Sequence, residues 1–337
     1  MTSLQRVLSA VAHRSPDRIP CTLYIDDDLQ ARLKREERED LLSEIARFES
    51  DTVRILWDFE HKRIDDRNMI DPFGVRWSRG DVNAYFFEDP PMREPDASQL
   101  PRIALLPATE AQRIRDIRDR NPDKFLYYQF TMTFGERMWA MRGFNQYLMD
   151  LLDEPRFIHE ALDLLMQMHF DAIDQLVKLP IDGITFGDDF GSQRGMIISP
   201  ELFREFFKPR LRQMYGRVAA AGLVVGAHSD GDNLPIIPDL IEIGLQVFHP
   251  IQPECMDLET LKREFGKDLT FRGGIGVQRG ISLGTADDVR HEVSRAARIL
   301  GRSGGYIMEP CKPLPPETPA DNVAAFLDAV KIAREMH

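Results

Sequence analysis

The stretch GLVVGAHSDG, Gly222 to Gly231, determines how the rest of the chain is interpreted. Its apolar residues run directly into His228, Ser229 and Asp230, and a glycine stands at each end. A short apolar run bounded by glycines is typical of a buried strand. Residues two apart in a strand share a face, so this strand would deliver an imidazole and a carboxylate to one point. In a parallel α/β barrel, the carboxyl ends of the strands carry the chemistry.

Seven further runs are predicted strands: Arg18–Ile25, Thr52–Trp57, Phe125–Phe130, Ile181–Phe186, Gln246–His249, Leu269–Arg272 and Gly304–Met308. Helical patterns follow each of the eight, which predicts an α/β fold, a (β/α)8 TIM barrel forming a single domain over residues 1–337. A hairpin about a Gly-Asp turn is predicted within Asp71–Pro90, in an insertion after the second strand at about residues 58–107. A doubly wound sheet is disfavoured because no Gly-x-Gly-x-x-Gly follows the first strand.

Composition narrows the class of protein. The formal net charge is −12 and no basic block stands out, which argues against a nucleic-acid partner. No apolar run approaches the ~18 residues that span a bilayer, and the N-terminal segment does not resemble a secretory signal. Three sparse cysteines, Cys21, Cys255 and Cys311, fit a reducing compartment. We therefore expect a cytoplasmic enzyme without a nucleic-acid or membrane partner; a homodimer remains open.

Paired carboxylates follow the fourth predicted strand. Asp188 and Asp189 end it, with Gln193 and Arg194 close behind. Adjacent side chains in an extended chain point apart, so one carboxylate can face a cavity while the other caps the loop or pairs with Arg194. On the next strand, the pattern His-x-Asp fits a metal site or acid–base catalysis, because both need these residue types. The structural alternatives are a capped loop and a histidine hydrogen-bonded within its loop.

The last three predicted strands also end in polar residues: His249, Gln252 and Glu254; Arg272; and Glu309, Cys311 and Lys312. Arg272 is a candidate clamp for an anion or a carboxylate. Cys311, in a proline-rich loop, is either a zinc thiolate or a structural residue. Ser229 lacks the context of a nucleophile elbow, and no Cys-x-x-Cys or phosphate-binding glycine-rich loop is present.

Motifs over nearly the whole chain resemble, in the same order, those of the uroporphyrinogen decarboxylase-like superfamily. That group contains the decarboxylase and zinc-dependent methyltransferases that work with corrinoid proteins. The matching segments are RVLSAVAHRSPDRIP (6–20), FGERMWAMRGFNQYLMDLLDEP (134–155), GDDFGSQRGMIISPELFREFFKPR (187–210), AHSDGDNLPIIPDLIEIG (227–244), HPIQPECMDLETLKREFGKDLTFRGGIGVQ (249–278) and PPETPADNV (315–323). The resemblance implies the barrel fold and an active site at its mouth.

The sequence departs from both branches of this superfamily. The decarboxylase is marked by an arginine-rich loop after the first strand, where this chain has the acidic YIDDDLQARLK, so porphyrinogen decarboxylation is not expected. The methyltransferases carry His-x-Cys after the fifth strand and a second Cys after the eighth. Here His228 matches, Asp230 replaces the first Cys, and Cys311 or its neighbour Lys312 takes the second position. Fewer thiolates would make a bound zinc a harder Lewis acid, suited to an oxygen substrate.

The resemblance and the strand-end residues together imply a corrinoid-linked, zinc-dependent methyltransferase or O-demethylase. It would act on a small methoxylated or hydroxylated compound, with a corrinoid partner protein over the barrel mouth, and Arg194 or Arg272 would hold a substrate carboxylate. The alternatives are a metal-free lyase or decarboxylase on a small carboxylic acid and a non-catalytic binding barrel. We expect the following roles: catalytic, Asp188, Asp189, Arg194, Arg272 and Lys312; substrate-binding, Tyr128, Gln193 and Gln252; metal-binding, His228, Asp230, Glu254 and Cys311.

Overall fold

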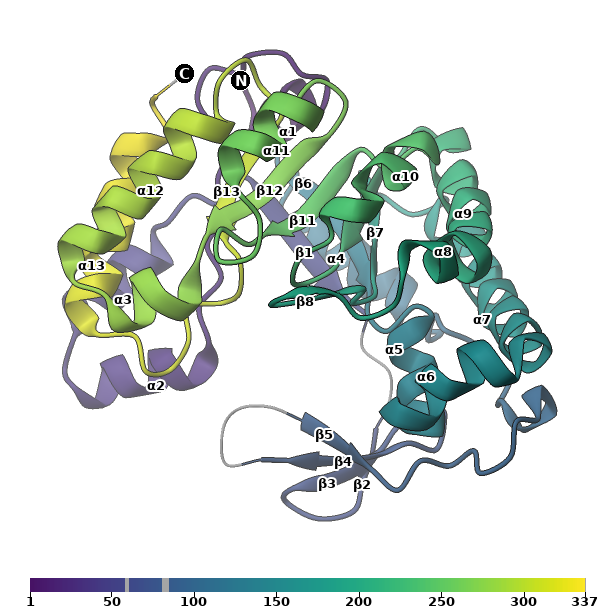
Figure 1. The fold of residues 1–337 in the computed structure, drawn as a ribbon. Coiled ribbons are helices and arrows are strands. Elements are labelled where there is room, and N and C mark those ends of the chain that lie inside the picture. The colour runs from purple at the N-terminus through teal and green to yellow at the C-terminus, as the bar shows by residue number, and fades with distance from the viewer. Residues whose placement is uncertain (58–60, 81–84, 337) are drawn as a thin grey trace.

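The computed structural model of the chain describes residues 1–57, 61–80 and 85–336. A parallel sheet of seven strands lies at its centre and curls so that helices cover its outer face (Figure 1). In order across the sheet, the strands are β1 (Thr52–Leu56), β6 (Phe125–Phe130), β7 (Gly183–Gly187), β10 (Val224–His228), β11 (Val247–Ile251), β12 (Thr270–Ile275) and β13 (Tyr306–Pro310). The predicted α/β fold is thus confirmed, and all residues of β6, β7, β11, β12 and β13 are buried, as in sheets covered on both faces.

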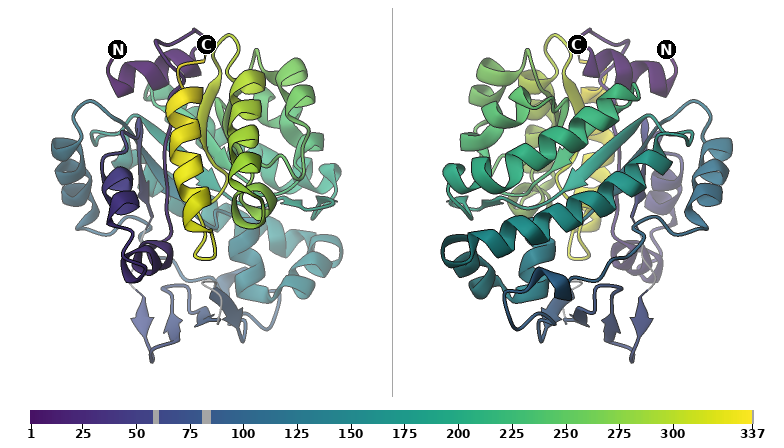
Figure 2. Two further views of the ribbon diagram at one scale, coloured as in Figure 1. Left: turned by 90° about the vertical axis from the view of Figure 1, so that its left-hand side faces the viewer. Right: turned by 90° about the vertical axis from the view of Figure 1, so that its right-hand side faces the viewer.

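Most helices lie in the connections between the strands, whereas α2 and α3 precede β1 and α13 follows β13 (Figure 2). The α-helices are α2 (Asp27–Arg35), α3 (Glu39–Ala46), α4 (Glu110–Arg120), α5 (Gly135–Arg142), α6 (Phe144–Asp153), α7 (Pro155–Leu176), α8 (Pro200–Leu202), α9 (Lys208–Ala220), α10 (Ile237–Glu242), α11 (Leu258–Phe265), α12 (Ala286–Leu300) and α13 (Ala320–Ala333). The short 3₁₀ helices are η1 (Ala97–Gln99) and η3 (Leu234–Ile236), and the short π-helices are η2 (Phe203–Phe207) and η4 (Val277–Ile281). Helix α7 buries residues at three- and four-residue spacing, which is the pattern that predicted it. Within the described ranges, no helix has the length and apolarity needed to cross a bilayer.

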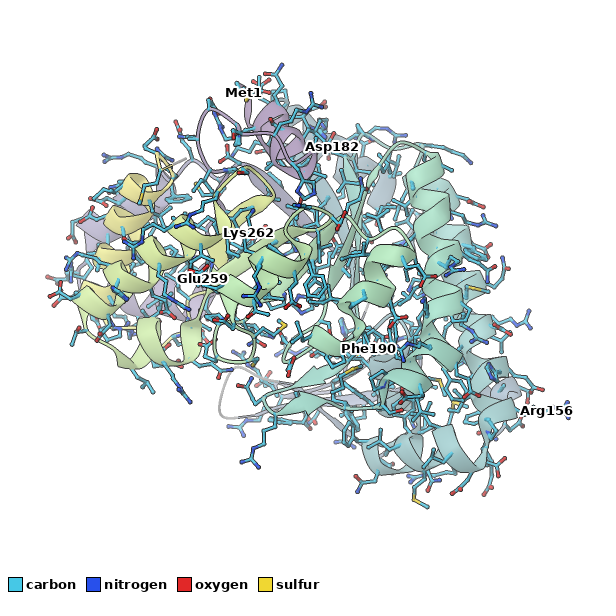
Figure 3. All side chains as sticks on the ribbon, turned by 45° about the horizontal axis from the view of Figure 1, so that its top comes forward. Met1, Arg156, Asp182, Phe190, Glu259 and Lys262 are labelled. Atoms are coloured by element: carbon cyan, nitrogen blue, oxygen red, sulfur yellow. The ribbon has the colours of Figure 1, made fainter. Side chains whose placement is uncertain are left out.

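Helix α1 (Ser3–Val11) closes the end of the barrel at which the strands begin. The carbonyl of Ala10 accepts a hydrogen bond from the Gly305 amide just before β13, and Val7 and Val11 pack against interior residues of the strands. In Figure 3, Asp182 and Phe190 mark the two ends of β7, so the strands run away from α1 towards the antiparallel strands described below. The carboxyl ends of the strands therefore form the open end.

The predicted first strand, Arg18–Ile25, is not a regular strand, and this prediction needs correction. The segment makes only the isolated parallel bridges Cys21↔Met308 and Ile25↔Leu314. The physical reason is that side chains accept its amide hydrogens: the Asp51 carboxylate accepts from Cys21 at 2.9 Å, and the Ser50 hydroxyl accepts from Leu23 at 3.2 Å. The segment still lies between β13 and β1, because the Cys21 carbonyl accepts from the Asp51 amide.

The chain after β1 forms a separate antiparallel sheet of four strands: β2 (Lys62–Arg63), β3 (Asn68–Ile70), β4 (Arg76–Arg79) and β5 (Tyr85–Glu88). Strands β4 and β5 pair with each other within the range in which a hairpin is predicted. The turn expected between them, residues 81–84, lies outside the described residues. A further short pair, β8 (Gly191–Ser192) and β9 (Gly195–Met196), follows β7.

A buried ion pair fixes the antiparallel sheet to α5. Asp71, just after β3, accepts from Arg137 Nη1 at 2.6 Å, and neither side chain is more than 1% exposed. The same carboxylate accepts from the amides of Phe73 and Val75 and from the Trp77 indole. Because α5 begins beside the end of β7, this contact connects the antiparallel sheet to the open end of the barrel.

We expect Asp71→Ala to lower the free energy of unfolding by about 3–5 kcal/mol, because it leaves the Arg137 guanidinium buried without its carboxylate. Urea unfolding followed by circular dichroism measures this. The control is Asp66→Ala in the same part of the chain, whose carboxylate is 96% exposed and should matter little. Equal effects of the two variants would show that the buried pair has no special role.

Candidate active site

The two carboxylates after β7 point in different directions. Asp188 accepts three backbone N–H bonds at the start of α5, from Phe134 at 3.0 Å and from Gly135 and Glu136 at 2.8 Å each. Asp189 instead accepts from the amide of Asp230, at the end of the neighbouring strand, at 2.8 Å. Asp188 thus positions α5 and Asp189 joins the loop that carries the His-x-Asp pattern.

Three acidic groups at this end have raised pKa values. Burial raises the pKa of Asp188 to about 7, against the lowering effect of its three backbone donors. Burial and then the charge of Asp230 raise the pKa of Asp189 to about 6. Burial, followed by the charges of the neighbouring aspartates, raises the pKa of Glu136 well above its ordinary value. These carboxyl groups therefore retain protons closer to neutral pH than exposed ones do.

Three side chains converge as a set of potential metal ligands. One ligand atom each from Asp189, His228 and Asp230 lies within 4.8 Å of the others. His228 Nε2 lies 3.9 Å from Asp230 Oδ1, a buried oxygen that has no hydrogen-bond partner within the described residues. The other oxygen of Asp230 lies 2.5 Å from Lys312 Nζ. Burial opposes the Lys312 cation, but the charges of the surrounding carboxylates outweigh burial and raise its pKa.

A chain of contacts extends from His228 into the barrel. His228 Nδ1 lies 2.7 Å from His249 Nδ1, and His249 Nε2 lies 2.7 Å from Glu309 Oε1. Burial lowers the pKa of both histidines, so both imidazoles are neutral. When His249 donates to Glu309, its Nδ1 accepts from His228, and Nε2 of His228 is left with a lone pair facing Asp230. A neutral imidazole with a free Nε2 is a metal ligand.

The wall formed by β1, β6, β12 and β13 is basic and aromatic. Arg272 Nε lies 3.2 Å from Glu309 Oε1, and its guanidinium carbon lies 4.5 Å from the centre of the Tyr127 ring. The hydroxyls of Tyr127 and Tyr24 are 3.3 Å apart, and Arg54 stacks on Tyr24 at 4.3 Å. The two sides of the barrel mouth therefore differ in charge.

The predicted metal ligands Cys311 and Glu254 lie outside the three-residue group. The Cys311 thiol is buried and lies 3.2 Å from the Ile251 carbonyl, and burial raises its pKa well above the ordinary value, which disfavours a thiolate. Glu254 accepts a long hydrogen bond from the Gln278 amide at 3.4 Å. Gln252, a predicted substrate ligand, accepts from the Gly231 amide at 2.5 Å and so holds the loop after His228.

The remaining predicted residues lie at the edge of the site or outside it. Gln193 and Arg194 are exposed on the turn between β8 and β9. Tyr128 is fully buried beside Phe130 on the outer face of β6, because alternation turns it away from the interior. Its neighbour Tyr127 occupies the interior face instead.

The expectations did not include Glu136, Tyr127, Tyr24 or Arg54. Because successive side chains of a strand point to opposite faces, the run FLYYQF predicts that Tyr127 and Tyr128 lie on different faces of the sheet. Arg54 is the single charged residue in the apolar run TVRILW, and this exception to the apolar pattern could have marked it as a functional candidate. Glu136 gives no sequence signal of its own, because it approaches the aspartates only once Asp188 binds the start of α5.

The chain is similar to known proteins in sequence and in fold. Residues 134–332 match the family model described as uroporphyrinogen decarboxylase (URO-D). A solved methyltransferase from Methanosarcina mazei is similar in fold, with a TM-score of 0.72 and 16% identity over 98% of this chain and 99% of that chain. D-psicose 3-epimerase from Clostridium cellulolyticum H10, solved with D-tagatose, aligns over 89% of this chain and 93% of that chain at 11% identity, with a TM-score of 0.45. No curated protein sequence matches the chain.

We expect Asp189→Asn to stabilise the metal-free protein at pH 8 by up to about 3 kcal/mol, at about 1.4 kcal/mol per pKa unit. The pKa of Asp189 is raised in the fold, so its contribution to stability is complete below the unfolded pKa and is lost as pH rises through about 6. The advantage of the variant should therefore shrink as pH falls from about 8 to about 4. Urea unfolding with a chelator present measures it.

The control for this experiment is Asp174→Asn, which removes a carboxylate that is 56% exposed and paired with Arg217. Its effect on stability should depend little on pH over the same range. A stability difference for Asp189→Asn that stays constant with pH would contradict the raised pKa.

Proposed function

Because the chain belongs to the uroporphyrinogen decarboxylase family, we propose that it is a zinc-dependent, corrinoid-linked methyltransferase or O-demethylase. Its substrate is a small methoxylated or hydroxylated compound bound at the carboxyl ends of the strands. The observation that carries this proposal is the convergence of Asp189, His228 and Asp230 at the open end of the barrel. The fold shared with the Methanosarcina mazei methyltransferase supports it.

The three residues fit a zinc ion in both chemistry and spacing. His228 is neutral, its Nδ1 contacts His249, and its Nε2 faces a buried oxygen of Asp230 that has no other partner within the described chain. Zinc bonds of about 2.0–2.2 Å in tetrahedral geometry place two ligand atoms about 3.4 Å apart. The observed 3.9 Å between Nε2 and Oδ1 needs only a small closure to reach that value.

A zinc ion held by one imidazole and two carboxylates would act as a hard Lewis acid on a substrate oxygen. The proposed reaction would break the bond between that oxygen and the methyl carbon, and the methyl group would pass to a nucleophilic corrinoid carried by a partner protein. The oxygen keeps the electron pair of the broken bond and takes a proton. Glu136, whose raised pKa favours the protonated form, is placed to supply it.

A metal-free decarboxylase is the second candidate, and a specific observation favours it. Glu136, whose raised pKa favours the protonated form, interacts with the Lys312 cation, and that cation would hold a carboxylate while the Glu136 carboxyl group protonates the product. The two functions differ in their response to chelators. Turnover that survives complete removal of metal would favour the decarboxylase.

We expect purified protein to bind stoichiometric zinc, measured by elemental analysis after dialysis, and His228→Ala to lose it. The loss follows because the imidazole is the only nitrogen ligand in the three-residue group. The control His291→Ala removes an exposed histidine on α12 and should bind zinc like the wild type. A wild type without stoichiometric zinc would overturn the zinc-dependent form of the proposal.

We also expect Glu309→Gln to weaken zinc binding by about 10- to 100-fold, because Glu309 orients His249 and thereby the free nitrogen of His228. Competition with a chelator of known affinity measures the change. Glu317→Gln, an exposed position in the loop after β13, is the matched control. Equal zinc affinity in the Glu309 variant and the wild type would show that the contact chain does not support the metal site.

A further inference from the structure

Arg54 is a cation of the barrel interior that forms no ion pair with a carboxylate in the part of the chain that the structure describes. Thr52, Arg54 and Leu56 share one face of β1, and the Thr52 hydroxyl contacts the Thr22 hydroxyl at 2.8 Å across the interior. Arg54 stacks on the Tyr24 ring at 4.3 Å, and within the described residues it forms no hydrogen bond or ion pair. Arg137 and Arg272, by contrast, each face a carboxylate. A half-buried guanidinium of this kind has donors available for a ligand.

The surroundings of Arg54 carry excess positive charge. Arg54 is the register partner of Tyr127, whose ring also lies beneath the Arg272 guanidinium. Glu309 is the acidic residue near both arginines, and one of its oxygens is already shared by Arg272 and His249. Two cations thus face one carboxylate, whose second oxygen has no hydrogen-bond partner among the described residues, and the net positive charge of this group attracts an anion.

Two residues next to Arg54 in the barrel wall, Leu56 and Gln129, make this wall accessible and add a polar group to it. Leu56, the next interior residue of β1, is 41% exposed, so the wall is accessible from the mouth. Its register partner Gln129 is only 3% exposed, and Gln129 Oε1 has no hydrogen-bond partner in the part of the chain described. A buried acceptor without a partner is costly unless a ligand or water satisfies it.

We propose that Arg54 binds the carboxylate of the substrate, and therefore that the substrate is a small carboxylic acid bearing a methoxy or hydroxy group. The identity of that oxygen group rests on the proposed function. The opposite wall fixes the orientation, because the Asp230 carboxylate lies there and already pairs with the Lys312 cation. The carboxylate lies at Arg54 and the oxygen group lies at the three-residue group. Arg194, by contrast, is exposed on the β8–β9 turn.

The test uses matched probes with and without the charge: methoxyacetate against methoxyacetamide, and 3-methoxybenzoate against 3-methoxybenzamide. Calorimetry and thermal denaturation measure binding to the full chain. We expect the carboxylates to bind and to raise the melting temperature, whereas the amides do neither. Arg54→Met should weaken carboxylate binding by at least about tenfold, because it removes a charge-assisted donor. Arg54→Lys, which keeps the charge without the planar guanidinium, should retain part of it.

Arg217→Met is the matched control, since Arg217 also stacks on an aromatic ring, that of Phe170 at 4.0 Å, but on the outer surface. It should bind the carboxylates like the wild type. Circular dichroism of each ligand-free variant establishes that it is folded. The proposal is overturned if the wild type prefers neither carboxylate to its amide, or if Arg54→Met binds them as the wild type does.

The outcome separates this inference from the proposed function. If zinc binds stoichiometrically but carboxylates are not preferred, the assignment of Arg54 fails and the metal site stands. If carboxylates bind through Arg54 to a protein that takes up no zinc, the zinc-dependent methyl transfer fails and the role of Arg54 stands.

Discussion

The contact between His228 Nδ1 and His249 Nδ1, 2.7 Å long, is the interaction on which the candidate site depends. It joins the open end of the barrel to the buried Glu309 and Arg272, and it decides which nitrogen of His228 faces the carboxylates. The parallel register makes it possible, because β10 and β11 place the two histidines directly opposite each other. Any slip of one residue would turn one imidazole to the outer face.

Acidic and basic residues of the site gather on different elements, although Lys312 pairs with Asp230 and Glu309 lies beside Arg272. Acidic groups come from β7, β10 and α5, whereas basic and aromatic groups come from β1, β6 and β12. The acidic segment after Ile25 has a structural explanation: Asp26 caps α2 by accepting from the Asp28 amide at 2.8 Å. Because Asp26 has this capping role, the acidity of the segment is weaker evidence about the charge of the substrate than the sequence alone suggests.

Much of the framework was predictable, because buried parallel strands are continuous apolar runs and β6 matches its predicted range, Phe125–Phe130, at both ends. The irregular backbone of Arg18–Ile25 was not predictable, because the side chains of Asp51 and Ser50 accept hydrogen bonds from its amides in place of strand carbonyls. Asp189, His228 and Asp230 converge as the strand ends suggested. Cys311 and Tyr128 were harder to place, because a thiol can turn to a nearby carbonyl and adjacent residues of a strand face opposite ways.

We propose that a bound zinc ion would be held by one imidazole and two carboxylates rather than by a thiolate. X-ray absorption at the zinc edge of the zinc-loaded wild type tests this most directly, since sulfur and lighter ligands scatter at different distances. We expect only nitrogen and oxygen ligands at about 2.0–2.2 Å. A sulfur ligand at about 2.3 Å would contradict it and would bring Cys311 back as a ligand.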